Sequence, residues 1–247
     1  MLISFCGGRL FGEVYGSGNT RAVALPGWRR SHGDYEKVGN GLPFAMAALD
    51  PPGFGATPPP DEPWGSVRYG ELIASAISEI GAPVVLVGHS FGGRVAVQVA
   101  AGYPELVSAL VLTGVPLLPS NLSGGRKRPP ARFRVVRQLH KRGLISEKTM
   151  ENARQKYGSV DYRQASGVMR SVLVASVNES YEEVLSRITC PVELVWADDD
   201  AEVPIRVAEG LAAAITGSKL TICPGAGHIL PLTAPEALRQ AIQRAAA

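Results

Sequence analysis

The chain of 247 residues has few of the side chains that cross-link secreted proteins or hold metal ions, since it contains three cysteines and four histidines. Cys6, Cys190 and Cys223 are odd in number and show no CxxC spacing. This pattern argues against a disulfide framework and against a zinc site. We therefore expect a protein of the reducing cytoplasm that binds no metal ion.

The sequence also lacks a segment that predicts a targeting signal or a membrane span. Residues 1–6 contain no basic start followed by a long apolar run. Residues 106–125 carry no charge, but prolines at 116 and 119 interrupt them, and the first half is typical of a buried strand. No transmembrane helix is therefore expected.

Acidic residues are absent from positions 106–146, although the whole chain has a net charge of only +3. The same stretch contains eight basic residues, namely Arg126, Lys127, Arg128, Arg132, Arg134, Arg137, Lys141 and Arg142. Such asymmetry favours an anionic substrate, an acidic partner or a membrane surface, while a solvated surface is the alternative. Nucleic acid is not expected as a partner, because Phe133 is the one aromatic residue within the basic run.

A strand, a tight turn and a helix are predicted in succession around the sequence GHSFGG at 88–93. Glycines on both sides of Ser90 allow the strand and the helix to approach closely, so the serine is displayed at the tip of the turn. The backbone N–H of Phe91 then lies at a helix N-terminus, where it can stabilise an oxyanion. A phosphate-binding loop is disfavoured, because neither GxxxxGK[ST] nor GxGxxG is present. The pattern predicts a nucleophile elbow.

A serine hydroxyl needs a general base, and His228 is the histidine best placed to serve as one. It lies in a glycine-rich loop after a strand-like run, before a helix predicted to begin with a capping box at 233–236. Loops at the carboxyl ends of strands build the sites of α/β sheets. His32 and His140 lie in charged stretches, and His89 adjoins the nucleophile. A purely structural loop histidine is the alternative for His228.

Three consecutive aspartates at 198–200 offer the carboxylate that would orient the base. They follow a strand-like run at 192–196. A triple acid run is commonly a solvated turn, so only one of the three is expected to turn inward. Composition alone does not select among them.

With a serine elbow, an acid and a histidine in this chain order, the sequence resembles the α/β-hydrolases over most of its length. Members carry the acid in a GxxDxxxP-like segment, which ADDDAEVP at 197–204 matches with alanine in place of glycine. The resemblance therefore implies a catalytic triad of Ser90, Asp200 and His228. The other family position for the acid, after the strand at 109–115, holds no carboxylate.

The same resemblance implies an oxyanion hole built from the backbone N–H groups of Trp28 and Phe91. The Trp28 loop follows an early strand, with proline in place of the family's usual histidine. The sequence DPPGFG at 50–55 resembles the family's turn that supports this loop. Arg29, beside the loop, and His89, beside the nucleophile, are candidate substrate-binding residues.

Strand-like and helical stretches alternate along the chain, which predicts a mostly parallel sheet covered by helices on both faces. Strands are expected at 22–25, 44–49, 84–87, 109–113, 192–196 and 219–222, and helices at 67–80, 93–102, 204–215 and 234–246. An antiparallel hairpin is expected at the N-terminus, from residues 2–5 and 10–15.

A helical insertion is predicted between residues 116 and 189, where the family carries its lid. Helical segments are expected at 131–142, 146–157, 161–175 and 179–186. The resemblance thus implies an α/β-hydrolase core of residues 1–115 and 190–247 and a cap of residues 116–189. Such a cap covers the strand ends, excludes water and shapes the substrate pockets.

These observations predict a serine hydrolase that cleaves a carboxylic ester of a small or medium-sized molecule through an acyl-enzyme, without a cofactor. Lactonases, thioesterases and carbon–carbon bond hydrolases of this fold keep the serine, so they remain alternatives. A ligand-binding protein with this fold and a scaffold role for the basic segment are further alternatives. The expected partner is a small-molecule substrate, with an anionic one among the options, and the sequence leaves the oligomeric state open.

Overall fold

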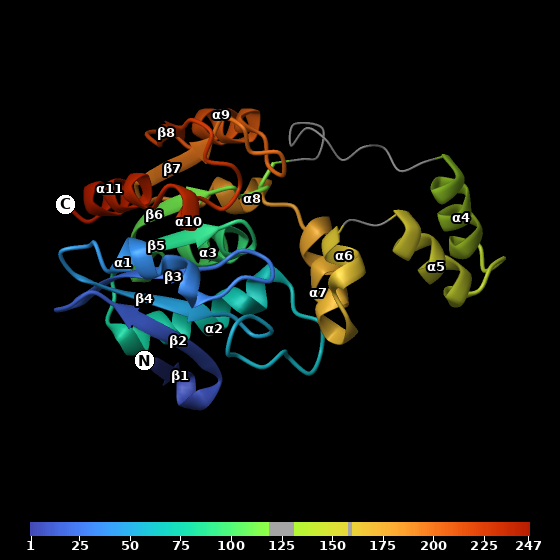
Figure 1. The fold of residues 1–247 in the computed structure, drawn as a ribbon, viewed down its shortest axis with the longest axis horizontal. Helices are drawn as coiled ribbons and strands as arrows, with labels where there is room; N and C mark the ends of the chain where they lie inside the picture. Colours follow the sequence, from blue (N-terminus) through green and yellow to red (C-terminus); the bar gives the residue numbers. More distant parts are fainter. Residues whose placement is uncertain (119–130, 158–159) are drawn as a thin grey trace.

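The computed structural model describes residues 1–118, 131–157 and 160–247. Its strands are β1 (Leu2–Phe5), β2 (Leu10–Tyr15), β3 (Thr20–Leu25), β4 (Ala45–Asp50), β5 (Val84–His89), β6 (Val107–Thr113), β7 (Val192–Ala197) and β8 (Lys219–Cys223). They form one sheet in the order β1-β2-β4-β3-β5-β6-β7-β8 (Figure 1). The β1–β2 pair is the antiparallel hairpin that the sequence predicts. The β2–β4 pair is also antiparallel, and the others are parallel, which agrees with the predicted mostly parallel sheet.

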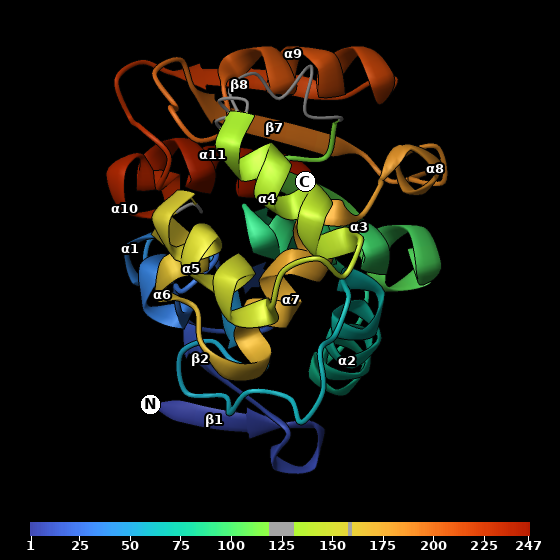
Figure 2. The ribbon, with the colours of Figure 1, turned by 90° about the vertical axis from the view of Figure 1, so that its right-hand side faces the viewer.

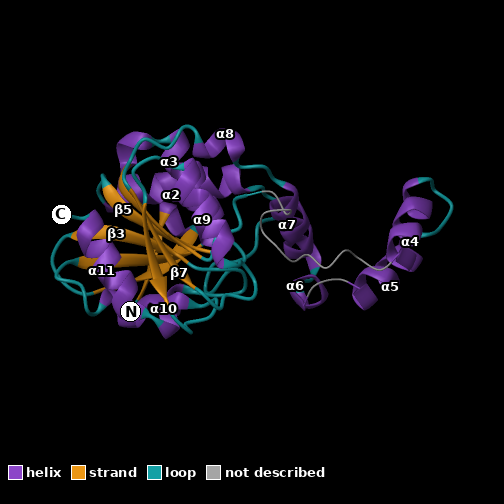
Figure 3. Cartoon of the chain, turned by 90° about the horizontal axis from the view of Figure 1, so that it is seen from above, coloured by secondary structure: helices purple, strands orange, loops and turns teal. Residues whose placement is uncertain are grey.

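Both faces of the sheet are buried under helices, which explains why its central strands are almost continuously apolar. In β5, Val84 and Leu86 face one core cluster, while Val85 and Val87 face the other. The first face is covered by α2 (Ser66–Ile80), α3 (Phe91–Gly102) and α9 (Ile205–Ala214), and the second by α1 (Glu36–Gly39), α10 (Leu230–Thr233) and α11 (Pro235–Ala245). Figure 3 shows these two helical layers on either side of the strands.

The start of the C-terminal helix differs from the prediction of a capping box. Ala234 precedes α11 and supplies no side-chain cap, and the Thr233 hydroxyl donates instead to the carbonyl oxygen of Ile229 at 3.0 Å. Pro235 is the first helical residue. A backbone N–H at this position would have no acceptor within the helix, so proline loses no hydrogen bond there. The capping-box interpretation was therefore wrong, although a helix is present.

Helices follow β6 in the described part of the insertion, namely α4 (Ala131–Lys141), α5 (Glu147–Tyr157), α6 (Val160–Gln164), α7 (Gly167–Asn178) and α8 (Glu182–Leu185). The single helix predicted at 161–175 is wrong, because it is divided into α6 and α7. Ser166 is extended, with φ −132° and ψ 164°, and Gly167 has a left-handed φ of 52°. Neither conformation continues a right-handed helix.

The last helices of the insertion, α7 and α8, pack on the core, whereas the first described helix, α4, does not. Val172 of α7 and Val184 and Leu185 of α8 belong to the same apolar cluster as α2 and α3. By contrast, α4 buries none of its residues and stands with α5 away from the sheet (Figures 1 and 3). Figure 2 shows α4 to α7 in front of the core, on the side where the candidate site lies.

Within the described ranges, no helix combines the length and the apolar character that crossing a bilayer requires.

Candidate active site

Ser90 lies in the sharp turn between β5 and α3, with φ 48° and ψ −112°. A non-glycine residue in this region is strained, and the surrounding hydrogen bonds hold it there. Its backbone N–H donates to the carbonyl oxygen of Thr113 at 3.0 Å, and its own carbonyl accepts from the N–H groups of Gly93 and Arg94. The strand, turn and helix that the sequence predicts around Ser90 are therefore present.

The turn requires glycine at two positions where backbone segments nearly touch. A Cβ on Gly88 would lie 2.4 Å from the Cα of Gly93. A Cβ on Gly92 would lie 2.3 Å from the carbonyl oxygen of Leu25. Both neighbours are backbone atoms that no side-chain rotation can move away. A side chain at either position would push the elbow away from the strands that support it.

Asp200 and His228 meet although they come from separate loops, after β7 and β8. The Nδ1–H of His228 donates to Oδ2 of Asp200 at 2.8 Å. The other carboxylate oxygen, Oδ1, accepts the backbone N–H groups of Glu202 and Val203, each at 2.8 Å. These contacts fix the buried carboxylate and, through it, the orientation of the imidazole.

The far side of the imidazole faces a second carboxylate. Nε2 of His228 lies 3.4 Å from Oε2 of Glu202. Among the described contacts, the Ser90 hydroxyl makes no hydrogen bond to His228. Catalytic hydrogen bonds are often long in unliganded sites and shorten when substrate binds. Of the three predicted triad residues, His228 and Asp200 are thus hydrogen-bonded to each other, and Ser90 lies at the turn between β5 and α3.

The other two aspartates of the acid run hold the histidine loop in place. The Gly225 N–H donates to Oδ1 of Asp198 at 2.9 Å, and the Gly227 N–H donates to Oδ1 of Asp199 at 2.8 Å. Of the three aspartates, Asp200 is the one that contacts the imidazole ring. Sequence reasoning missed this supporting role, for which the one available signal was a glycine-rich loop following the neighbouring strand.

Burial and neighbouring charges shift the pKa values of the His228–Asp200 pair in opposite directions. Burial lowers the pKa of His228, but the hydrogen bond and charge of Asp200, with the charges of Glu202 and Asp161, outweigh burial and raise the pKa above its ordinary value. Burial raises the pKa of Asp200, but its hydrogen bond to His228 and the two backbone donors produce a net lowering. Asp200 therefore stays charged while His228 is a stronger base than a free imidazole.

His89 is only 1% exposed and packs against His228, with ring centroids 4.9 Å apart. Its Nε2–H donates to the carbonyl oxygen of His228 at 3.0 Å. Burial, followed by the charge of His228, lowers the pKa of His89 to about 3, so the ring is neutral. The structure thus places His89 under the histidine loop and not among the residues that line the cavity described below.

The two predicted oxyanion donors are held together by aromatic packing. The rings of Trp28 and Phe91 lie 5.6 Å apart, and Phe54 packs against both, at 5.4 and 4.9 Å. The Gly92 N–H donates to the carbonyl oxygen of Pro26 at 3.0 Å, which ties the loop to the start of α3. In the part of the chain that the structure describes, neither the Trp28 nor the Phe91 backbone N–H has a protein acceptor. Both donors are available to a ligand.

Asp50 supports this loop from below, as the sequence predicts. Its buried carboxylate accepts the backbone N–H of His32 at 2.6 Å and that of Ala56 at 2.8 Å. The His32 ring adds a contact to Oδ2 at 2.7 Å. The turn that begins at Asp50 therefore connects the loop after β3 to the loop after β4.

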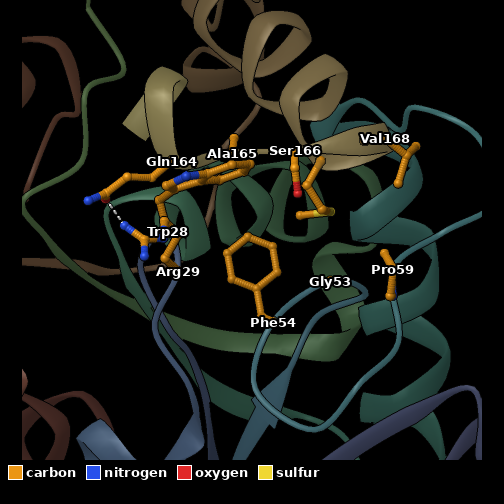
Figure 4. A pocket seen from close by; sticks show the side chains of 11 residues that line it. Trp28, Arg29, Gly53, Phe54, Pro59, Gln164, Ala165, Ser166 and Val168 are labelled. Atoms are coloured by element: carbon orange, nitrogen blue, oxygen red, sulfur yellow. Dashed lines mark hydrogen bonds between the residues drawn. The ribbon is translucent and has the colours of Figure 1, made fainter. Parts of the chain in front are cut away.

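A cavity of about 340 Å³ lies between the Trp28 loop and the insertion (Figure 4). Its lining consists of Trp28, Arg29, Gly53, Phe54, Pro59 and residues 164–169. Phe54, Pro59 and Met169 make much of it apolar. Ser90 and His228 are not among the lining residues. The residue shared by the cavity lining and the candidate catalytic groups is Trp28, the predicted oxyanion donor.

Arg29 is the charged residue in the described lining of this cavity. Its guanidinium donates to Oε1 of Gln164 at the end of α6, as the dashed line in Figure 4 marks. Arg30, by contrast, forms an ion pair with Asp34, at 2.5 and 2.6 Å. The amide of Gln164 does not neutralise the charge of Arg29, whereas the carboxylate of Asp34 neutralises that of Arg30.

An eight-stranded, mostly parallel sheet with a serine elbow and an acid–histidine pair at its carboxyl edge defines the α/β-hydrolase fold. A model of the alpha/beta hydrolase family matches residues 22–241, and the chain belongs to this family.

Named relatives and solved structures agree with this family. The chain is 28% identical over 166 residues to a putative carbamate hydrolase of Cronobacter sakazakii, a match that covers 61% of this chain and 60% of the relative. It is 24% identical over 253 residues to a pimeloyl-[acyl-carrier protein] methyl ester esterase of Yersinia enterocolitica, with coverages of 95% and 96%. The first relatives are thus matched over about three fifths of their length.

Among solved structures, an esterase from Exiguobacterium antarcticum superimposes with a TM-score of 0.74 at 21% identity. The superposition covers 99% of this chain and 98% of the esterase. At this identity the likeness shows the fold alone.

Proposed function

We propose that this protein is a serine hydrolase that cleaves a carboxylic ester with Ser90 as nucleophile, His228 as general base and Asp200 as the orienting acid. The observation that carries the proposal is the 2.8 Å bond from the Nδ1–H of His228 to Asp200. This bond places the proton of the neutral imidazole on Nδ1. The lone pair of Nε2 is then free to accept a proton from the serine.

In the proposed reaction, Ser90 Oγ attacks the ester carbonyl while Nε2 of His228 takes the hydroxyl proton. The backbone N–H groups of Trp28 and Phe91 stabilise the oxyanion of the tetrahedral intermediate. The C–O bond then breaks, and Nε2 donates its proton to the departing alcohol. A water molecule, deprotonated by His228, attacks the acyl-enzyme and releases the carboxylic acid. No step calls for a cofactor.

We further propose that residues 116–189 act as a cap on a core of residues 1–115 and 190–247. The support is that residues 164–169, from the insertion, line one wall of the cavity next to Trp28. A wall of this kind excludes water and selects the substrate by shape. The three free cysteines agree with our proposal of a reducing cytoplasm.

The proposal that the small-molecule substrate is anionic rests on Arg29. Arg126, Lys127 and Arg128, whose charges also favour it, lie outside the described residues. The other basic residues of the run lie on or directly after α4, which stands away from the sheet. Arg29 is instead at the cavity itself, and its partner among the described residues is the uncharged Gln164. His89, buried under the catalytic loop, is proposed to position His228 and not to contact substrate.

Replacing Arg29 with glutamine is expected to raise KM for an ester with a carboxylate at the end of its acyl chain by about fivefold to tenfold, because one charged hydrogen bond is lost. KM for the uncharged isostere should change little. Steady-state kinetics of both esters at low and high salt measures the difference. Arg187→Gln, an exposed arginine away from the cavity lining, is the matched control. Equal changes for both esters would mean that Arg29 does not bind the carboxylate.

The proposed function is tested by reaction with a fluorophosphonate and by a panel of substrates. An aligned serine, base and oxyanion hole should give stoichiometric labelling, whereas a folded ligand-binding protein with a misaligned triad should label poorly. The panel compares kcat/KM for esters, thioesters, lactones, carbamates and carbon–carbon bond substrates of matched acyl length. We expect the highest value for an ester. A folded protein that neither labels nor turns over any of them would refute the proposal.

A further inference from the structure

Glu202 places a negative charge on the side of His228 from which a leaving group must depart. Its Oε2 lies 3.4 Å from Nε2, while Asp200 holds Nδ1 on the opposite side of the ring. The Glu202 side chain is 66% exposed, so it stands at the solvent edge of the site. In the described part of the chain, His228 is the ionic partner found for this carboxylate.

The backbone of Glu202 is fixed by the same contacts that hold the acid of the triad. Its N–H donates to Oδ1 of Asp200 at 2.8 Å. The next residue, Val203, is buried, donates to the same oxygen, and accepts the indole N–H of Trp196 at 2.8 Å. The side chain therefore starts from a fixed backbone position beside His228, and in the structure its carboxylate lies against Nε2.

We infer that Glu202 selects the leaving group by charge, disfavouring esters whose alcohol portion is anionic relative to those whose alcohol portion is neutral or cationic. The inference rests on the proposed function, because it requires that Nε2 of His228 protonate the leaving oxygen. That oxygen must come within hydrogen-bond distance of Nε2, roughly 3 Å. The substituents of the alcohol then lie close to Glu202, where a like charge is repelled.

Among the described residues, the charged groups that act on His228 are carboxylates, and Arg30, which acts on the neighbouring His89, is paired with Asp34. Asp161 of α6 contributes a second negative charge from the insertion, and Asp200 contributes a third from behind the ring. His89 packs on the other side of the ring and is neutral. Arg29 is engaged with Gln164 in the lining of the cavity. A negative substituent is thus proposed to be accepted on the acyl side and disfavoured on the alcohol side.

The test uses three acetate esters of phenols that carry a trimethylammonium, a carboxamide or a carboxylate group at the same ring position. In the parent protein, kcat/KM should fall in that order. In Glu202→Gln, kcat/KM for the carboxylate ester relative to that for the carboxamide ester should rise about fivefold. The value for the trimethylammonium ester relative to the carboxamide ester should fall by a similar factor. Changes of this size are expected when one nearby exposed charge is removed. Both changes should shrink in 1 M salt, where charges are screened beyond about 3 Å.

A second readout is the pH profile with the carboxamide ester. Because Glu202 raises the pKa of His228, its replacement should move the acid limb of kcat/KM to lower pH. Glu209→Gln, which removes an exposed charge on α9, is the matched control and should change neither the ratios nor the limb. Fluorophosphonate labelling of every variant reports whether the triad is intact.

The outcomes separate this inference from the proposed function. If the parent hydrolyses the carboxamide ester and labels, but Glu202→Gln leaves the three ratios unchanged, charge selection is overturned and the hydrolase remains. If the variant loses activity toward all three esters equally, Glu202 has a structural role and the inference is again overturned. If the parent neither labels nor hydrolyses any of the three, the proposed function itself fails.

Discussion

Replacing Ser90 with alanine is expected to lower kcat for the best ester by roughly a thousandfold or more, because the attacking hydroxyl is removed. Fluorophosphonate labelling should disappear. The fold should persist, since alanine keeps the Cβ and the turn is held by backbone contacts to Thr113, Gly93 and Arg94. Steady-state turnover, labelling and thermal unfolding of the purified variant measure these three effects.

The control for this experiment is Ser75→Ala, an exposed serine of α2 whose hydroxyl donates to the carbonyl oxygen of Glu71. It should retain turnover and labelling. Ester turnover that survives in the Ser90 variant would contradict the assignment of the nucleophile. A variant with a much lower melting temperature would instead indicate that the strained turn at φ 48° depends on the hydroxyl.

Replacing Asp200 with asparagine is expected to lower kcat by about a hundredfold to ten-thousandfold. An asparagine whose amide nitrogen faces His228 requires Nδ1 to accept, which moves the imidazole proton to Nε2. Nε2 then cannot take the proton of Ser90. The amide oxygen still accepts the N–H groups of Glu202 and Val203, so the loop should keep its shape. Single-turnover kinetics together with thermal unfolding separate the chemical effect from a structural one.

Asp198→Asn and Asp199→Asn are the matched controls in the same loop. An asparagine oxygen can still accept the Gly225 N–H or the Gly227 N–H, so both variants should keep most of their turnover. If either of them is more damaging than Asp200→Asn, the assignment of Asp200 as the acid is wrong.

The part of the candidate site that the sequence predicts well is the part that local geometry produces. A β-branched strand, glycines that permit close backbone approach and a helix all lie within residues 84–102, so the elbow needs no distant contact to be recognised. The predictions that failed also concern local detail. The break between α6 and α7 reflects the extended backbone of Ser166 and the left-handed φ of Gly167, and α11 begins at Pro235, a residue suited to the first helical position. The periodicity of apolar residues registers neither signal.

The amino-acid sequence by itself determined the alternation of strands and helices, the elbow at Ser90 and the chain order of serine, acid and histidine. The resemblance selected Asp200 as the acid, and only the tertiary structure decided that its two neighbours hold the histidine loop and that Glu202 faces Nε2. The physical reason is that parallel strands bring loops from distant parts of the chain to one edge of the sheet. Contacts made there depend on how the loops after β7 and β8 converge, and no spacing within either loop encodes that distance.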